Sequence, residues 1–177
     1  ASYRNEEAVG AGLRASGVAR DEVFVTTKVW WTDLAAGDLR RSAEASLKRL
    51  GLDAVDLLLI HWPNPEIPLE DTVRALNAAK ADGLTRHIGV SNFPTALLTQ
   101  AIGLSNAPLV ANQVEHHPYL DQGKVYAACR AAGMAMVSYC PLHRGGGELL
   151  AEPAVTAAAQ AHGKTPGQVV LRWHVQQ

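Results

Sequence analysis

Three side chains of this sequence have the types needed to reduce a carbonyl group: the phenol of Tyr3, the ammonium of Lys28 and the imidazole of His61. Carbonyl reduction requires a donor that protonates the developing alkoxide, and a phenol is a weak donor near neutrality because it ionises only near about pH 10. A cation at Lys28 beside Tyr3 would stabilise the phenolate, and a neutral His61 could donate a hydrogen bond that orients the carbonyl. Together the three residues predict proton donation during hydride transfer.

Four further side chains suit the binding of a nicotinamide ring, which supplies hydride in many enzymes. Ser91, Asn92 and Gln113 offer donors and acceptors that could fix its carboxamide, and Tyr139 offers a flat surface for stacking. The sequence therefore contains candidate groups both for the reaction and for its cofactor.

Each candidate also has a plainer interpretation when it is taken alone. A lysine such as Lys28 is most often a solvated surface charge, His61 could be a satisfied core histidine, and Tyr139 could be a packing residue. Trp30 and Trp62, next to Lys28 and His61, could wall an apolar substrate pocket or could simply pack. Because all these residue types belong to one mechanism, the functional interpretation is favoured.

The elements that must position these residues follow a repeated pattern. Five apolar runs each end in a polar or aromatic candidate residue, at residues 23–28, 57–61, 88–92, 110–113 and 136–139. A continuous apolar run is typical of a buried parallel strand, and each run is followed by a segment with helical periodicity. The pattern predicts repeated β/α units whose polar strand ends share one rim, which is the active-site face of a β/α barrel.

The expected helices lie between and after these strands, and several end at a glycine. Asn5 is expected to cap the first helix and Asp38 to open the second, while Thr165 and Pro166 supply the N-cap and first turn of the last. A glycine-rich loop is expected over residues 141–147. The helices are predicted at residues 5–15, 38–50, 70–82, from 95 onward, 124–132, 152–162 and from 166 onward.

Composition narrows the class of protein. The 177 residues are 47% hydrophobic and 19% charged with a formal charge of -1, which is typical of a globular protein and gives no support to nucleic-acid or anionic-membrane binding. Cys129 and Cys140 are expected to be reduced thiols of a cytoplasmic protein. No apolar run has the length of a membrane span or of a secretory signal. We expect a small-molecule carbonyl substrate as the partner.

Six segments resemble motifs of the aldo-keto reductases, and they occur in that family's order. They begin with residues 3–6 around the tyrosine, 26–30 around the lysine and 59–63 around the histidine, and continue with residues 89–93, 112–115 and 138–142. The surroundings of His61 are most similar to those of bacterial 2,5-diketo-D-gluconate reductases. The resemblance implies a (β/α)8 TIM barrel, NADPH extended across its C-terminal rim, and reduction of aldehydes or ketones to alcohols.

The resemblance also implies a role for each matching residue. Tyr3 matches the general acid, Lys28 its partner cation and His61 the group that orients the carbonyl. Ser91, Asn92 and Gln113 match the carboxamide binders and Tyr139 the stacking ring. The remaining matches are Leu142 in the loop that approaches the pyrophosphate, and Trp30 and Trp62 as pocket walls.

The sequence departs from the family pattern in several places. The family's aspartate that pairs with the lysine lies a few residues upstream of the tyrosine, and its Lys-Ser segment with the arginine that grips the 2'-phosphate lies in the last strand. Neither is present here, and Cys140 and His143 stand where this branch more often has serine and glycine. We therefore expect one partial barrel domain over residues 1–177, with about five of eight strands, that is inactive by itself but monomeric when full length.

Other functions fit the sequence less well. Residues 89–93 lack the second glycine of a hydrolase nucleophile elbow. His116 and His117 are adjacent on an extended segment and should point to opposite faces, which does not suit one metal ion. No metal site is therefore expected. The alternative that stays open is a barrel that binds NADPH without turnover, or an inactive fragment of the enzyme; keto-sugar acids and small aldehydes such as methylglyoxal are the candidate substrates.

Overall fold

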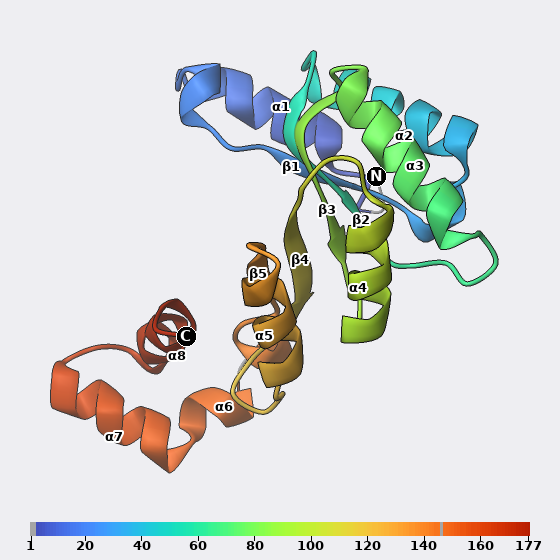
Figure 1. Ribbon diagram of the computed structural model, residues 1–177. Helices are drawn as coiled ribbons and strands as arrows, with labels where there is room; N and C mark the ends of the chain where they lie inside the picture. Colours follow the sequence, from blue (N-terminus) through green and yellow to red (C-terminus); the bar gives the residue numbers. More distant parts are fainter. Residues whose placement is uncertain (1–2, 146) are drawn as a thin grey trace.

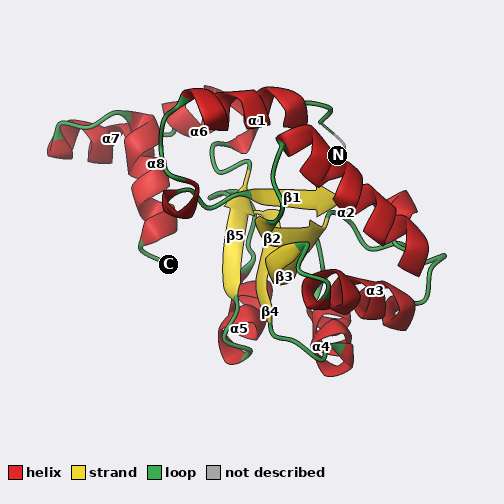
Figure 2. Ribbon diagram, turned by 90° about the horizontal axis from the view of Figure 1, so that it is seen from above, coloured by secondary structure: helices red, strands yellow, loops and turns green. Residues whose placement is uncertain are grey.

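The computed structural model describes residues 3–145 and 147–177. Its strands form one parallel sheet in which spatial order follows sequence order, as Figure 2 shows from above. Adjacent strands of a β/α barrel have this arrangement, so the predicted fold class is confirmed for the described part of the chain. The strands are β1 (Thr26–Val29), β2 (Val55–Ile60), β3 (Thr85–Ser91), β4 (Leu109–Glu115) and β5 (Ala135–Tyr139).

The helices that follow β1, β2, β3 and β4 alternate with the strands and pack along one face of the sheet. In Figure 1, α6, α7 and α8 lie on the side of β5, away from α2 and α3. The helices are α1 (Glu6–Ala15), α2 (Ala36–Leu50), α3 (Leu69–Ala81), α4 (Thr95–Leu104), α5 (Gly123–Ala131), α6 (Gly147–Ala151), α7 (Pro153–His162) and α8 (Pro166–Val175), and short 3-10 turns cover Arg20–Glu22, Trp31–Asp33 and His143–Gly145.

Alternation along the strands divides the buried residues between two faces of the sheet. Leu58 and Ile60 of β2 pack in the large cluster shared with the helices, whereas Leu57, Leu59 and Ala111 form a small cluster on the inner face. Successive side chains of a strand point to opposite faces, which explains the division. All six residues of β2 are buried, as expected for a strand inside a covered parallel sheet.

The structure corrects several expected boundaries. The first strand begins at Thr26 rather than at residue 23, and α2 begins at Ala36, two residues before Asp38. Asn5 precedes α1, but its side chain makes no capping hydrogen bond. The expected start of α8 is confirmed, because Thr165 and Gln168 form a complete capping box.

The expected loop over residues 141–147 is partly helical. A 3-10 turn covers His143–Gly145 and α6 begins at Gly147, while Gly146 lies outside the described residues. The glycine-rich composition did not predict this short helix. Its Leu149 side chain is buried, and such packing stabilises a helix that is too short to be stable by itself.

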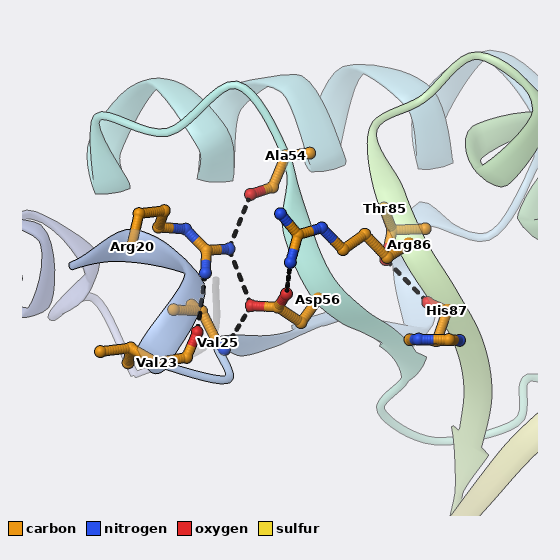
Figure 3. Close-up of polar contacts among 8 residues, drawn as sticks. All are labelled: Arg20, Val23, Val25, Ala54, Asp56, Thr85, Arg86 and His87. Atoms are coloured by element: carbon orange, nitrogen blue, oxygen red, sulfur yellow. Dashed lines mark hydrogen bonds and ion pairs between the residues drawn. The ribbon is translucent and has the colours of Figure 1, made fainter.

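A cluster of charges holds the amino-terminal ends of β1 and β2 together, and Figure 3 shows it. The buried carboxylate of Asp56 accepts a hydrogen bond from the Val25 N–H at 2.8 Å, and it pairs with Arg20 at 2.7 Å and with Arg86 at 2.8 Å. Burial alone would raise the pKa of Asp56, but the Val25 hydrogen bond and the two arginines lower it overall. The cluster lies at the end of the sheet opposite to the candidate residues of the rim.

Candidate active site

The carboxyl ends of the strands carry most of the predicted site residues. Lys28 lies one residue before the end of β1, His61 follows β2, Ser91 ends β3 and Tyr139 ends β5. Gln113 lies on β4 and pairs in register with Ser91. Parallel strands place their carboxyl ends at the same edge of the sheet, so these side chains share one rim.

Tyr3, Lys28 and His61 come together although they lie far apart in the sequence. The Tyr3 hydroxyl is 3.5 Å from Nε2 of His61, and the Lys28 ammonium is 5.4 Å from the centre of the Tyr3 ring. Tyr3 is 67% exposed, whereas His61 is buried. A phenol that is open to solvent and adjoins both a cation and an imidazole can transfer a proton to a molecule bound at the rim.

The surroundings of His61 favour its neutral form. Burial first, and the charge of Lys28 second, lower the pKa of His61 from its ordinary value of 6.5 to about 4. Burial also lowers the pKa of Lys28 from its ordinary value. A neutral imidazole keeps one N–H and one lone pair, so His61 can donate a hydrogen bond to a carbonyl oxygen without carrying a charge.

Asn92 is the centre of a second group of residues at the rim. Its Nδ2 donates to the His61 carbonyl at 2.9 Å and to the Ser91 hydroxyl at 3.1 Å, and its Oδ1 accepts from the Tyr139 hydroxyl at 2.9 Å. The Ser91 hydroxyl donates in turn to the carbonyl of Gln113 at 2.7 Å. Four of the five predicted cofactor residues therefore form one network, in which Gln113 takes part through its backbone carbonyl and Asn92 is joined to the backbone of His61.

The conformation of Asn92 supports a role beyond packing. Its φ is 62°, in the left-handed region that non-glycine residues rarely adopt. Such strain persists only where surrounding contacts impose it, and it is common at binding sites. Both Nδ2 protons of Asn92 are already donated, so a carboxamide at this rim would bind to the remaining lone pair of Oδ1 or to the side chain of Gln113.

A cavity of about 310 Å³ opens beside this network, and its lining includes Trp62, Asn92 and Tyr139. Trp30 makes an edge contact with His61, with ring centres 4.9 Å apart. Trp30 thus adjoins the proton-transfer residues and Trp62 adjoins the cofactor residues, and their role as pocket walls stays a prediction. Larger cavities along α8 and beside α5 contain none of the predicted site residues, and the lining of the 310 Å³ cavity contains predicted cofactor residues but none of the three proton-transfer residues.

The loop after β5 contains Leu142 between two residues with unusual backbone conformations. Cys140 has a φ of 51° and His143 a φ of 49°. Leu142 is partly exposed, and its place beside the pyrophosphate stays a prediction. Cys129 and Cys140 are both free thiols, with Cys129 buried.

The adjacent histidines His116 and His117 are both buried. His116 Nδ1 lies 3.1 Å from the Ser138 hydroxyl, and His117 Nε2 lies 3.4 Å from a carboxylate oxygen of Glu115. Across residues 3–145 and 147–177, no group of three or more His, Cys, Asp or Glu side chains is arranged to hold a metal ion.

The carboxylate of Glu6, in the first turn of α1, was not singled out from the sequence. It is buried and accepts a hydrogen bond from the Thr27 hydroxyl at 2.7 Å, next to Lys28. Glu6 and Gly10 lie four residues apart on the buried face of α1, but a glutamate in the first turn of a helix is usually solvated, so this spacing did not predict its burial.

With regard to membranes, the described part of the chain has no helix with both the length and the apolar character of a bilayer span.

Sequence and structure comparisons identify the family. The model of the Aldo/keto reductase family matches residues 1–177, so the chain belongs to this family. It is 47% identical over 177 residues to an aldo-keto reductase of Mycobacterium sp. (strain MCS), in a match that covers 99% of this chain and 62% of the relative. It is also 42% identical to the methylglyoxal reductase DkgB of Yersinia pestis, over 98% of this chain and 66% of that protein.

Solved structures agree with the sequence relatives. A putative 2,5-diketo-D-gluconic acid reductase B superposes with a TM-score of 0.96 at 45% identity, over 99% of this chain and 62% of the other. An aldo-keto reductase of Bombyx mori in complex with NADP superposes with a TM-score of 0.91 at 35% identity, over 99% of this chain and 64% of the other. The chain thus spans somewhat less than two thirds of the length of most of these proteins.

Proposed function

We propose that the protein reduces aldehydes or ketones to alcohols, with NADPH as the hydride donor and Tyr3 as the proton donor. The observation that carries this proposal is the contact of the Tyr3 hydroxyl with His61 at 3.5 Å, beside the ammonium of Lys28. A proton donor, a stabilising cation and a neutral hydrogen-bond donor are the groups that protonation of a carbonyl oxygen requires.

Each residue then has a separate task. His61 donates a hydrogen bond that holds the carbonyl oxygen, and its lowered pKa keeps it neutral at the pH of the reaction. Tyr3 transfers its hydroxyl proton to that oxygen as negative charge develops. Lys28 stabilises the phenolate that remains, because a positive charge a few ångströms away lowers the energy of the anion.

The donor set of the rim fits a nicotinamide cofactor. The ring of Tyr139 offers a stacking face, and the amides of Asn92 and Gln113 offer partners to a carboxamide. NADPH, when bound, supplies the hydride. Burial first and the charge of Glu115 second raise the pKa of Tyr139, so its phenol keeps the proton that it donates to Asn92.

Small reactive aldehydes and keto-sugar acids are the proposed substrates. Relatives of this chain carry the names methylglyoxal reductase and glyoxal reductase, and a structural neighbour carries the name 2,5-diketo-D-gluconic acid reductase B. Trp30 and Trp62 would contact the carbon skeleton of such a substrate, since both adjoin the site. We propose that the full-length protein works as a cytoplasmic monomer.

The test is a turnover assay with NADPH or NADH and a panel of methylglyoxal, glyoxal, 2,5-diketo-D-gluconate and an aromatic aldehyde. The protein should be assayed in the form its cell produces, with cofactor affinity measured separately by fluorescence quenching. We expect turnover with NADPH on at least one carbonyl. Tight NADPH binding without turnover on any of them would instead support a non-catalytic NADPH-binding barrel.

A further inference from the structure

Glu6 carries a buried carboxylate that takes no part in the proposed proton transfer. It is 6% exposed at the start of α1. One carboxylate oxygen accepts a hydrogen bond from the Thr27 hydroxyl at 2.7 Å. The other accepts a hydrogen bond from Nε of Arg49 at 2.7 Å and forms an ion pair with Nη2 of the same arginine at 2.6 Å. A carboxylate removed from water needs partners of this kind, because an uncompensated buried charge is strongly destabilising.

The charge of Glu6 is firmly maintained. Burial alone would raise the pKa of Glu6, but hydrogen bonds from Thr27 first, and from Arg49 and Ser46 among other groups, lower it to about 2. The group is therefore an anion throughout the pH range in which enzymes work. Charge-assisted hydrogen bonds to such an anion are shorter and stronger than neutral ones, so they restrain the segments that they join.

Those segments are the two that carry the proposed acid and its partner cation. Tyr3 precedes Glu6 by three residues, and Thr27 immediately precedes Lys28. Side chains alternate along a strand, so Thr27 faces α1 while Lys28 lies on the inner face, where it pairs in register with Leu59. The hydrogen bond between Glu6 and Thr27 therefore restrains both the segment that carries Tyr3 and the strand that carries Lys28.

The rest of α1 is held against α2, and this contact limits how far Glu6 can move. A Cβ atom added to Gly10 would lie 2.2 Å from the backbone oxygen of Leu50, so the two helices are in direct backbone contact. Arg14 also donates to that carbonyl at 3.3 Å. Because α1 is fixed on α2 in this way, the contacts of Glu6 at the start of α1 determine the position of the segment that precedes the helix.

We propose that Glu6 is a positioning residue, which sets the Tyr3 hydroxyl beside Lys28 and His61 by holding Thr27 and Arg49. This inference rests on the proposed reductase function for its kinetic consequence. Its geometric content, that the Glu6–Thr27 bond fixes Tyr3, can be measured without any turnover.

The test uses Thr27, because removing Glu6 itself would leave Arg49 unpaired and would threaten the fold. Thr27→Val removes the hydroxyl while keeping the shape of the side chain, and Thr27→Ser keeps the hydroxyl. We expect Thr27→Val to lower kcat by about tenfold, since small misplacements of reacting groups are costly. KM and the dissociation constant of NADPH should stay within twofold, and Thr27→Ser should restore kcat.

Arg86→Met is the matched control. It removes one partner from the buried carboxylate of Asp56, which lies at the far end of the sheet (Figure 3). We expect it to lower the melting temperature while leaving kcat unchanged. An equal loss of kcat in Arg86→Met and Thr27→Val would mean that general destabilisation is responsible, and would overturn the positioning role.

A second measurement separates this inference from the proposed function. In protein labelled with ¹³C at tyrosine Cζ, the Tyr3 resonance is assigned by its loss in Tyr3→Phe. We expect it to shift in Thr27→Val but not in Thr27→Ser or Arg86→Met, even if no carbonyl proves to be a substrate. A Tyr3 resonance that stays in place in Thr27→Val, or an unchanged kcat in an active enzyme, would refute the positioning role.

Discussion

His61 is held in its neutral form by burial and by a neighbouring positive charge. Between its ordinary pKa of 6.5 and the lowered value of about 4, the unfolded chain binds a proton at this site that the folded chain does not. The stabilising contribution of the neutral form is therefore complete above about pH 6.5 and is lost as the pH falls toward 4.

The titration of His61 gives a direct prediction. Its imidazole resonances should titrate with a midpoint near pH 4, in place of the ordinary value of 6.5. Lys28→Met should raise the midpoint only partly, because burial is the larger cause. NMR of protein labelled in its histidine rings measures both values, and a midpoint above 6 in the unaltered chain would contradict a neutral, buried His61.

Tyr139 allows the stacking role to be separated from the hydrogen bond to Asn92. Tyr139→Ala removes both ring and hydroxyl, and it should weaken NADPH binding by about 1 to 3 kcal/mol if stacking on a nicotinamide resembles stacking on a nucleic-acid base. Tyr139→Phe removes only the bond to Asn92 and should keep most of the affinity. Fluorescence titration compares the two, and equal affinity of the alanine variant and the parent would show that Tyr139 only packs.

Single residues also show where sequence reasoning reached its limit. The positions of Lys28 and His61 at one rim were predictable, because each follows or ends an apolar run that indicated a strand. Tyr3 precedes α1, and it was placed beside them only by the chemistry of the three groups and by the family resemblance. The burial of Glu6 was not predictable, since a glutamate in the first turn of a helix is usually solvated. Its partner Arg49 is 43 residues away, and no local pattern connects the two.

Among the elements, β1 shows how a side chain changes a strand boundary. The apolar run predicts a strand from residue 23, but the N–H of Val25 donates to the side chain of Asp56 instead of to a neighbouring strand. Regular pairing begins with Thr26, opposite Leu57. The other four strands were located within a few residues from their apolar runs, although only β2 is buried along its whole length and β5 contains no buried residue.

The Asp56 cluster carries a prediction about how strands β1 and β2 are joined. Asp56→Ala removes the shared acceptor of Arg20, Arg86 and the Val25 N–H, and it should cost about 2 to 3 kcal/mol of stability. This loss of stability should be smaller than the loss caused by breaking a fully buried ion pair, because both arginine side chains are partly exposed to solvent. Chemical denaturation measures it, and a loss below about 1 kcal/mol would mean that the cluster contributes little.

At the scale of the whole molecule, the outer strands β1 and β5 each pair with a single neighbour in the described sheet. Unpaired strand edges promote association. We expect the 177-residue chain, expressed alone, to form oligomers or aggregates at micromolar concentration.

A matched pair of variants tests this expectation by size-exclusion chromatography. Val137→Lys places a charge on β5 and should reduce association, whereas Leu171→Lys on α8 should leave it unchanged. Both parent side chains are exposed, Val137 at 36% and Leu171 at 46%. A monomeric parent chain with a cooperative thermal transition would contradict the expectation.

The proton donor is the centre of the proposed mechanism, and Tyr3→Phe tests it most directly because the substitution removes only the hydroxyl. Single-turnover and steady-state oxidation of NADPH by methylglyoxal should be compared for the parent and the variant, with NADPH affinity as the control. The proposed mechanism predicts a fall in both kcat and kcat/KM on the order of a hundredfold or more, with NADPH binding intact. Turnover by Tyr3→Phe at the rate of the parent would contradict it.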